Sequence, residues 1–238
     1  MVEIEDICDC ESFIEWVEKR SQTEVDIIVG RAALRVLPIF LFWEFVESEE
    51  SAKLNESIRV LWQSLFSYNF NHCSNPKKPV PLPDLGRSRR AGKQMLLSRS
   101  RLWSVSPFAD AAHAATFAAF SQNALPSYIE FPNLALQHAI ETDIWIYVQS
   151  DCEDLDRNIS FKRKKLWGES QNPTSEIWTD TKAQLLKEES DWNFWVRWYD
   201  SVLAGKPLSC EMLFKILSIS QKDWRKDAAH VNGLIAEI

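Results

Sequence analysis

The feature that most constrains the fold is one stretch near the C-terminus, which reads DWNFWVRWYDSVLAGKPL over residues 191–208. When the stretch is placed on a helix at about 100° per residue, its large apolar side chains form one unbroken arc about 200° wide. A helix with so wide an apolar arc needs neighbours on two sides. The stretch therefore predicts a buried helix whose core residues are Phe194, Trp198, Val202, Trp195, Tyr199, Trp192, Leu203 and Val196.

The aromatic side chains of this arc leave a second interpretation open. Trp and Tyr are also the residues that dominate the energetics of protein–protein interfaces. On this alternative, part of the arc is a groove for a partner, formed by Trp192, Trp195, Trp198 and Tyr199. In the core interpretation, each buried indole N–H group needs a hydrogen-bond acceptor.

The N-terminal segment carries the signals of a capped, amphipathic helix. Asp9 is placed to accept hydrogen bonds from the first turn of a helix over residues 10–20. Phe13, Trp16 and Val17 then share one face of that helix. We expect this face to be buried.

Helix signals continue along the next segment. Thr23 and Asp26 resemble a capping box and predict a helix that begins near residue 24. Pro38 has no N–H to donate, so we expect it to kink or split this helix. Ser51 is placed to begin a further helix.

The second half of the chain shows the same helical pattern. Pro132 is expected to open a helix that runs to residue 149, and the polar segment 150–165 is expected to be a loop with a short helical turn. Asp191 is a candidate N-cap, and Gly205 can supply the left-handed position that ends a helix. The expected helices after Ser51 cover 52–68, 87–103, 106–123, 133–149, 174–189, 192–204, 209–219 and 222–238.

Together these signals predict an all-α, bundle-like domain of about nine or ten helices. Short alternating runs rich in β-branched residues are missing from the sequence, and only 6 glycines disfavour a turn-rich β fold. Four prolines make 71–86 a connector between an N-terminal helical subdomain, 1–70, and a C-terminal one with the Trp-rich core, 87–238. Two packed helical subdomains are therefore one form of the expected fold.

Several functional classes are disfavoured by composition. The sequence has no Gly-rich phosphate-binding loop. Its 5 cysteines lack CxxC spacing, which favours reduced thiols over a zinc site or a disulfide framework. Neither a signal peptide nor an apolar stretch of membrane-spanning length is evident. We therefore expect a soluble, cytoplasmic protein without a membrane partner.

The C-terminal third carries a recurrent pattern. The segments KLWGESQNPTSEIWTDTKAQLL, DWNFWVRWYDSVLAGKPL and DWRKDAAHVNGLIAEI place a W-x-x-W-x-x-W-Y helix before a glycine turn and a closing helix. This pattern resembles a group of uncharacterised bacterial proteins, and the segment RAALRVLP near the N-terminus extends the resemblance faintly. The resemblance implies a bacterial, cytoplasmic, helical protein, and it implies no particular activity.

Candidate catalytic and metal-binding arrangements are weak. The segments DAAH, 110–113, and HAIE, 138–141, each place a carboxylate and a histidine on one helical face, but a di-iron bundle needs two further carboxylates and a different order. His72 and Cys73 are adjacent, and adjacent side chains rarely point together. No common hydrolase, protease or kinase signature occurs. The sequence thus favours no enzymatic activity, catalytic residue, metal or cofactor.

Basic residues gather after the connector and form a candidate contact for a polyanion or a protein partner. They are Arg87, Arg89, Arg90, Lys93, Arg99 and Arg101. The segment KRKK, 162–165, adds a second basic patch. The simpler interpretation is a solvated face that pairs with the acidic N-terminal segment. A net charge of −7 argues against a dedicated DNA-coating protein.

The sequence leads to two hypotheses about function. The first is a non-enzymatic helical interaction or accessory protein, for example a component of a bacterial multi-protein system such as phage defence. Its partner is another protein, with self-association as a further option. The second is a nucleic-acid-associated module that uses the basic helix at 87–101.

Overall fold

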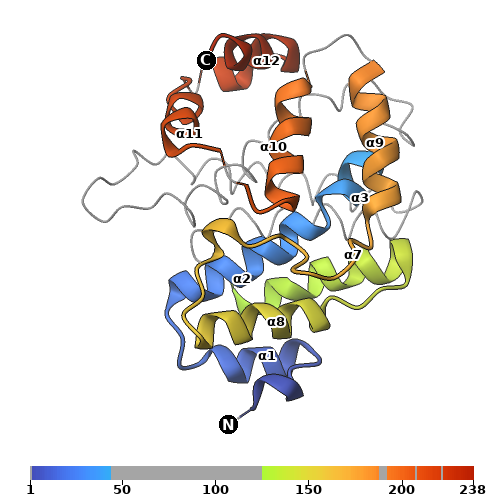
Figure 1. Cartoon of the computed structure of the whole chain (residues 1–238), viewed down its shortest axis with the longest axis vertical. Helices are drawn as coiled ribbons and strands as arrows, with labels where there is room; N and C mark the ends of the chain where they lie inside the picture. The colour runs from blue at the N-terminus through green and yellow to red at the C-terminus, as the bar shows by residue number, and fades with distance from the viewer. Residues whose placement is uncertain (1, 44–124, 188–191, 207, 221) are drawn as a thin grey trace.

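The structure, a computed structural model, describes residues 2–43, 125–187, 192–206, 208–220 and 222–238 (Figure 1). Helices make up 70% of this part of the chain, and it contains no β-strand. The predicted all-α fold class is therefore confirmed. If α2 and α3 below are counted as one interrupted helix, the described part has 8 α-helices, so nine or ten is a slight overcount there.

The N-terminal helices follow their capping signals. After a short 3-10 turn, η1 (Ile4–Asp6), helix α1 covers Cys10–Val17, and Asp9 caps it as predicted through a hydrogen bond from the Ser12 N–H. Phe13, Trp16 and Val17 are buried, as their spacing predicts.

Helix α2 (Gln22–Arg35) begins two residues earlier than expected. Its N-cap is Ser21, which exchanges capping-box hydrogen bonds with Glu24. The prediction of a box between Thr23 and Asp26 was wrong, because Ser21 and Glu24 offer the stronger Ser-x-x-Glu pattern. Helix α3 (Leu37–Phe42) follows after a single residue, with Pro38 in its first turn, so the predicted split is confirmed.

The predicted helix over 133–149 is wrong. After a 3-10 turn, η4 (Pro126–Ile129), helix α7 covers Glu130–Ile140 and ends at Glu141, whose φ of 51° is left-handed. Thr142 N–H then donates back to Leu136 O, which closes the helix end. Helix α8 (Trp145–Asp156) starts a new axis and takes in much of the segment expected to be a loop. Neither glycine nor proline marks this break in the sequence.

The C-terminal part consists of four further helices. They are α9 (Ser175–Lys187), α10 (Asn193–Leu203), α11 (Cys210–Leu217) and α12 (Ala228–Ala236), and the 3-10 turns η5 (Phe161–Arg163) and η6 (Asp223–Arg225) lie between them. One helix was expected over 222–238, but η6 and the N-cap Asp227 separate its first residues from α12. The predicted N-cap Asp191 lies outside the described residues.

Gly205 ends α10 in the left-handed conformation that the sequence predicts, with φ 65°. A Cβ at this position would lie 2.6 Å from the backbone oxygen of Arg163 and 2.8 Å from the backbone nitrogen of Lys165. Leu166 N–H also donates to Leu203 O at 3.4 Å. The glycine thus lets the segment after η5 lie directly against the end of α10.

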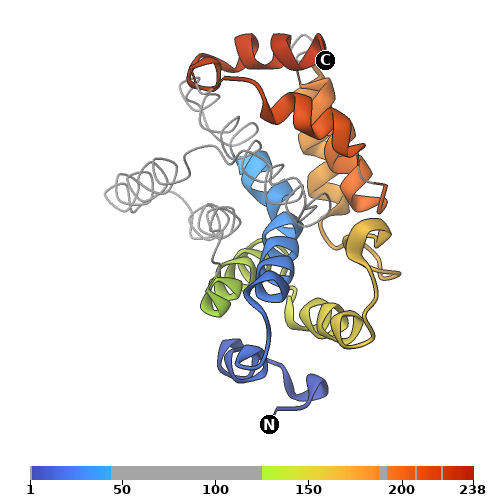
Figure 2. The same cartoon turned by 90° about the vertical axis from the view of Figure 1, so that its left-hand side faces the viewer.

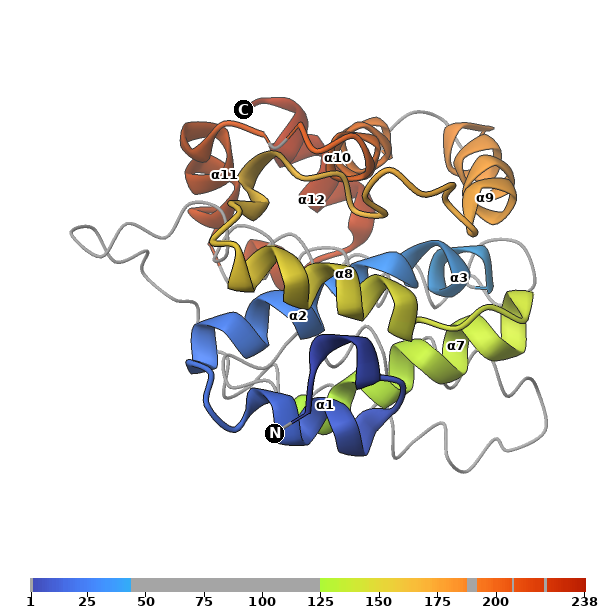
Figure 3. The same ribbon diagram turned by 60° about the horizontal axis from the view of Figure 1, so that its bottom comes forward.

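The described helices form an elongated arrangement with the two termini at opposite ends (Figures 1 and 2). Helices α1, α7 and α8 gather around α2 at the N-terminal end, which Figure 3 brings forward. Helix α3 continues from α2 toward α9, and α10 to α12 lie at the other end.

One hydrophobic cluster runs through this arrangement. It includes residues between Ile7 and Leu41 together with residues between Ile129 and Ile235. The predicted connector 71–86 lies outside the described residues, so the subdomain boundary stays a prediction. What the structure shows is that helices from before and after that segment share a single core.

Candidate functional site

The Trp-rich stretch lies inside the molecule. Trp192, Trp195, Trp198 and Tyr199 are at most 4% exposed. Trp195 Nε1 donates to Asn232 Oδ1 at 2.7 Å, and the Tyr199 hydroxyl donates to Leu34 O at 2.9 Å. These contacts match the core interpretation, and the four rings present no open groove in this structure.

The main cluster of predicted basic contacts lies outside the described residues, as do His72, Cys73 and the DAAH segment. The residues of this cluster are Arg87, Arg89, Arg90, Lys93, Arg99 and Arg101. In HAIE, both His138 and Glu141 are exposed at the end of α7. Within the described ranges, no group of three or more His, Cys, Asp or Glu side chains is suited to a metal ion.

The KRKK segment does not form a uniform basic face. Lys164 is turned toward acidic side chains of α8, in contact with Asp154 and 3.8 Å from Asp151 Oδ1. Lys165 pairs with Glu169 at 2.7 Å. Two of its four basic side chains are therefore already neutralised within the protein.

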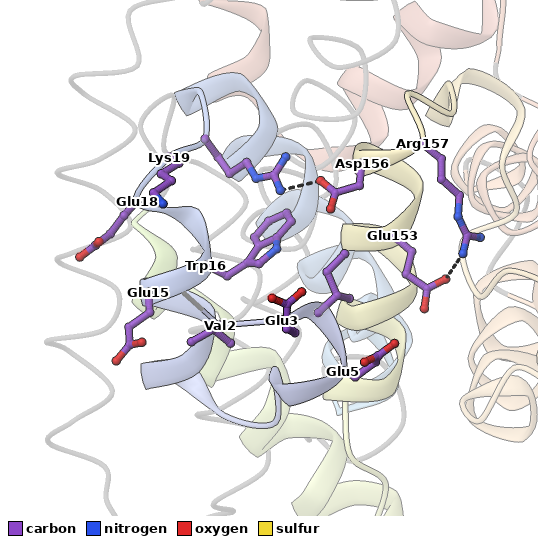
Figure 4. Close-up of a pocket in the computed structure, with 12 residues that line it drawn as sticks. Val2, Glu3, Glu5, Glu15, Trp16, Glu18, Lys19, Glu153, Asp156 and Arg157 are labelled. Carbon is purple, nitrogen blue, oxygen red and sulfur yellow. Dashed lines mark ion pairs between the residues drawn. The ribbon is translucent and has the colours of Figure 1, made fainter.

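An acidic groove lies between the N-terminal segment and the end of α8 (Figure 4). Its volume is about 870 Å³, and we call it the acidic groove below. The groove is lined by Val2, Glu3, Ile4, Glu5, Glu15, Trp16, Glu18, Lys19, Arg20, Glu153, Asp156 and Arg157. Six of these residues are acidic and three are basic.

Local contacts hold the two walls of the acidic groove together. The Gln149 side chain, on α8, donates to the backbone oxygens of Glu5 and Ile7 at 3.1 and 3.0 Å. Across the groove, Arg20 Nη2 pairs with Asp156 Oδ1 at 2.5 Å, and its guanidinium lies 4.1 Å from the centre of the Trp16 ring. The N-terminal segment, α1 and α8 thus form one fixed surface.

The acidic groove keeps an excess of negative charge after its internal pairs are counted. Arg20 and Arg157 pair with Asp156 and Glu153. Glu3, Glu5, Glu15 and Glu18 have exposed side chains that form no ion pair in the described part of the chain. The only other basic residue that lines the groove is Lys19. In Figure 4, Glu3 lies between the α1 and α8 walls, whereas Glu15 and Glu18 lie along the outer rim.

A second arrangement lies deeper, where α2 meets α8. Arg31 Nε donates to Asp151 Oδ1 at 3.1 Å, and Arg35 Nη2 forms an ion pair with Asp151 Oδ2 at 2.7 Å. The side chains of Arg31, Arg35 and Asp151 are 5%, 1% and 1% exposed. The two guanidinium groups also donate to backbone oxygens of Lys165 and Leu166 at 2.8–3.1 Å. We call this arrangement the buried arginine cluster.

Burial sets the electrostatics of this cluster. It lowers the pKa of Arg35 and of Lys164, and in both groups Asp151 opposes that shift. A guanidinium group stays protonated in proteins, so Arg35 is charged at neutral pH. Burial also raises the pKa values of Tyr147 and Cys152, so both side chains are uncharged at neutral pH.

Sequence reasoning missed both arrangements. Arg31 and Arg35 stand four residues apart in an otherwise apolar segment, which is a signal for one buried polar face. Their partner Asp151 lies in a segment that we expected to be a loop. The sequence suggested the acidic N-terminal residues only as partners for the basic helix, and not as the wall of a cavity.

Cys210 departs from the expectation of reduced thiols, since it is disulfide-bonded. Cys8, Cys10 and Cys152 are free. No helix in the described ranges has both the length and the apolar character that a membrane span requires. No protein-family model, curated protein or solved structure matches the chain.

Proposed function

We propose that the protein is a non-enzymatic interaction protein that docks a cationic segment of a protein partner in the acidic groove. The single observation that carries the proposal is the groove itself, with four carboxylates that form no ion pair with any other described residue. Lys and Arg side chains of a partner supply the missing charges. Such complementarity speeds encounter and rejects wrongly charged partners.

The shape of the acidic groove supports a peptide-like occupant. Its volume of about 870 Å³ lies at the upper end of the ~300–1,000 Å³ range of small-molecule sites, so it has room for side chains of a partner. Its walls come from a helix, a turn and a second helix that are tied together by Gln149 and Arg20. A fixed surface loses little conformational freedom when it binds.

The biological setting is part of the same proposal. The resemblance of the C-terminal pattern to bacterial proteins supports an accessory component of a bacterial multi-protein system, for example in phage defence. A cytoplasmic location fits this setting. The disulfide of Cys210 argues in the other direction, because disulfides are rare in the bacterial cytoplasm.

The alternative of a nucleic-acid-associated module gains no support from the described residues. Its basic helix, 87–101, lies outside them. The acidic groove repels a polyanion. The alternative stays a prediction, and it implies that the protein binds a DNA duplex.

The test is the binding of a fluorescein-labelled ten-residue peptide of alternating Arg and Gly, measured by anisotropy. We expect the combined substitution Glu3→Gln, Glu15→Gln and Glu18→Gln to weaken binding about tenfold, since exposed charge pairs contribute about 0.2–1 kcal/mol each. The matched control is Glu176→Gln, Asp180→Asn and Glu237→Gln, which changes the net charge equally at exposed positions outside the groove.

Three outcomes contradict the proposal. If both triple variants weaken peptide binding equally, the peptide responds only to the net charge of the protein. Unchanged binding in the groove variant places the contact elsewhere. Tighter binding of a mixed-sequence DNA duplex than of the peptide favours the nucleic-acid alternative.

A further inference from the structure

A small pocket opens beside the buried arginine cluster, away from the acidic groove. Its volume is about 80 Å³. One water needs only ~10–15 Å³, so the pocket has room for a group of several heavy atoms. It is lined by Arg35, Ile146, Tyr147, Ser150, Asp151, Lys164, Trp167, Gly168, Glu169 and Ser170. Ile146, Ser150, Glu169 and Ser170 are exposed, which gives the pocket an open mouth.

Two buried donors at the wall of this pocket have no hydrogen-bond acceptor among the residues that the structure describes. Arg35 uses Nε and Nη2 for Leu166 O and Asp151, whereas its Nη1 has no hydrogen-bond partner. Trp167 Nε1 has none either. Arg35 is 1% exposed and Trp167 is 3% exposed. Because a buried donor without an acceptor is costly, each such group points to an unidentified acceptor.

These two donors belong to one local structure. The guanidinium carbon of Arg35 lies 5.6 Å from the centre of the Trp167 ring and 5.5 Å from that of Tyr147. The two rings meet edge to face, with centroids 4.7 Å apart. Arg35 Nη1 offers two N–H groups and Trp167 offers one, so the two residues that line the pocket carry three N–H donors between them.

The charge count of the region favours a negative acceptor. The buried arginine cluster and Lys164 carry three positive charges, from Arg31, Arg35 and Lys164. Asp151 and Asp154 carry two negative charges, and the side chains of all five residues are at most 16% exposed. Glu169, at the mouth, is 88% exposed and pairs with Lys165. One positive charge in the interior is therefore left without a counter-charge among the described residues.

We propose that this pocket binds a small carboxylate monoanion, whose oxygens accept hydrogen bonds from Arg35 Nη1 and Trp167 Nε1. A carboxylate supplies the one missing negative charge and acceptor sites for three donors. A free organic acid and the C-terminal carboxylate of a peptide share this chemistry. The inference is independent of the proposed role of the acidic groove.

The test is a titration of the full chain, labelled with ¹⁵N, in which the indole N–H signals are observed by NMR. The signal that disappears in Trp167→Phe belongs to Trp167 Nε1. We expect millimolar sodium acetate to move this signal downfield with saturation, whereas equal concentrations of sodium chloride leave it in place. N-acetylglycine separates the two sources of carboxylate: a site for a peptide C-terminus binds it as well as acetate, whereas a site for a small free acid binds acetate alone. The amide of N-acetylglycine lacks the carboxylate and is expected to bind in neither case.

The variant Trp167→Phe keeps an aromatic ring at this position and both salt-bridged arginines, but it loses one donor. We expect it to weaken acetate binding about ten- to a hundredfold by calorimetry, since one hydrogen bond to a charged group is removed. Trp178→Phe is the matched control, because its indole donates to Asp200 and does not line the pocket. We expect its acetate affinity to equal that of the natural protein.

Several results overturn the carboxylate assignment. If inorganic phosphate binds more tightly than acetate, the acceptor is a different anion. If no anion moves the Trp167 signal at concentrations up to about 100 mM, the donors are satisfied by water only. If Trp167→Phe and Trp178→Phe weaken acetate binding equally, the anion binds outside this pocket.

Discussion

At the scale of single residues, Asp151 is the buried carboxylate that three basic side chains contact. It contacts Arg31, Arg35 and Lys164, and these residues connect α2, α8 and the segment after η5. Buried ion pairs contribute little when both partners are replaced together, but the loss of one partner leaves an uncompensated charge. Asp151 is therefore a position where a conservative change has a large cost.

We expect Asp151→Asn to lower the free energy of unfolding by about 3–5 kcal/mol, because two buried guanidinium groups lose their counter-charge. Urea unfolding followed by circular dichroism measures this change. The control is Glu169→Gln, which removes an exposed partner of Lys165 and should cost at most ~1 kcal/mol. Equal costs for the two variants would contradict the central position given to Asp151.

Asp223 gives a prediction about pH. Hydrogen bonds from Ser220, Lys226 and His230, at 2.6–3.1 Å, lower the pKa of this carboxyl. A lowered native pKa favours the folded state above the unfolded pKa of ~3.9, and this contribution is lost as the pH falls toward the native value. We expect Asp223→Asn to be less stable than the natural protein at pH 7 and to lose less stability between about pH 5 and pH 2. Chemical denaturation at a series of pH values measures this, with Asp180→Asn as the control. Parallel curves for the natural protein and Asp223→Asn would show that the carboxyl has no such role.

Single residues also mark the limit of sequence reasoning. The burial of Trp195 and Tyr199 followed from helical spacing, which is a local property. The pairing of Arg31 with Asp151 joins residues 120 positions apart, and no local pattern encodes it. The acidic residues were visible in the sequence, but the groove they line depends on how η1 and α8 are brought together.

At the scale of elements, capping signals and one glycine set the ends of helices that position the buried cluster. Gly205 lets the end of α10 lie against residues 163–165, and the backbone oxygens of Lys165 and Leu166 accept hydrogen bonds from Arg31 and Arg35. The conformation of this turn therefore affects the buried arginine cluster through backbone contacts.

We expect Gly205→Ala to lower the free energy of unfolding by more than ~1 kcal/mol, because alanine disfavours a positive φ and its Cβ would meet backbone atoms. Gly233→Ala is a matched control on α12, where an added Cβ has no atom within 4 Å and φ is not left-handed. There we expect a stabilisation of up to ~1 kcal/mol. Thermal unfolding compares the two, and a stabilisation by Gly205→Ala would show that the turn relaxes freely.

The helix ends that were predicted correctly carry a signal in the sequence. Asp9 begins α1, Pro38 separates α2 from α3, and Gly205 ends α10. The break between α7 and α8 has no such signal. There Glu141 adopts a left-handed conformation, and Asn133 accepts from the Ile144 N–H across the break at 3.4 Å. Contacts between α7 and the start of α8 therefore decide this break.

At the scale of the whole molecule, the acidic groove and the carboxylate pocket are separate in place and in charge. The acidic groove lies at the N-terminal end and carries excess negative charge on exposed side chains. The pocket lies beside a buried positive charge. Helix α8 contributes to both, through Glu153 and Asp156 in the first case and Tyr147 and Asp151 in the second. A partner at the groove and an anion in the pocket can therefore be examined independently.

Hydrogen exchange by mass spectrometry, with and without the Arg–Gly peptide, tests the central claim most directly, because it locates the contact on the chain. The account predicts slower exchange in two regions, residues 2–20 and the end of α8 near Glu153 and Asp156, which together form the acidic groove. Exchange in α11 and α12, at the opposite end of the described structure, should not change. Slower exchange confined to regions outside the acidic groove, or no change at saturating peptide, would contradict the account.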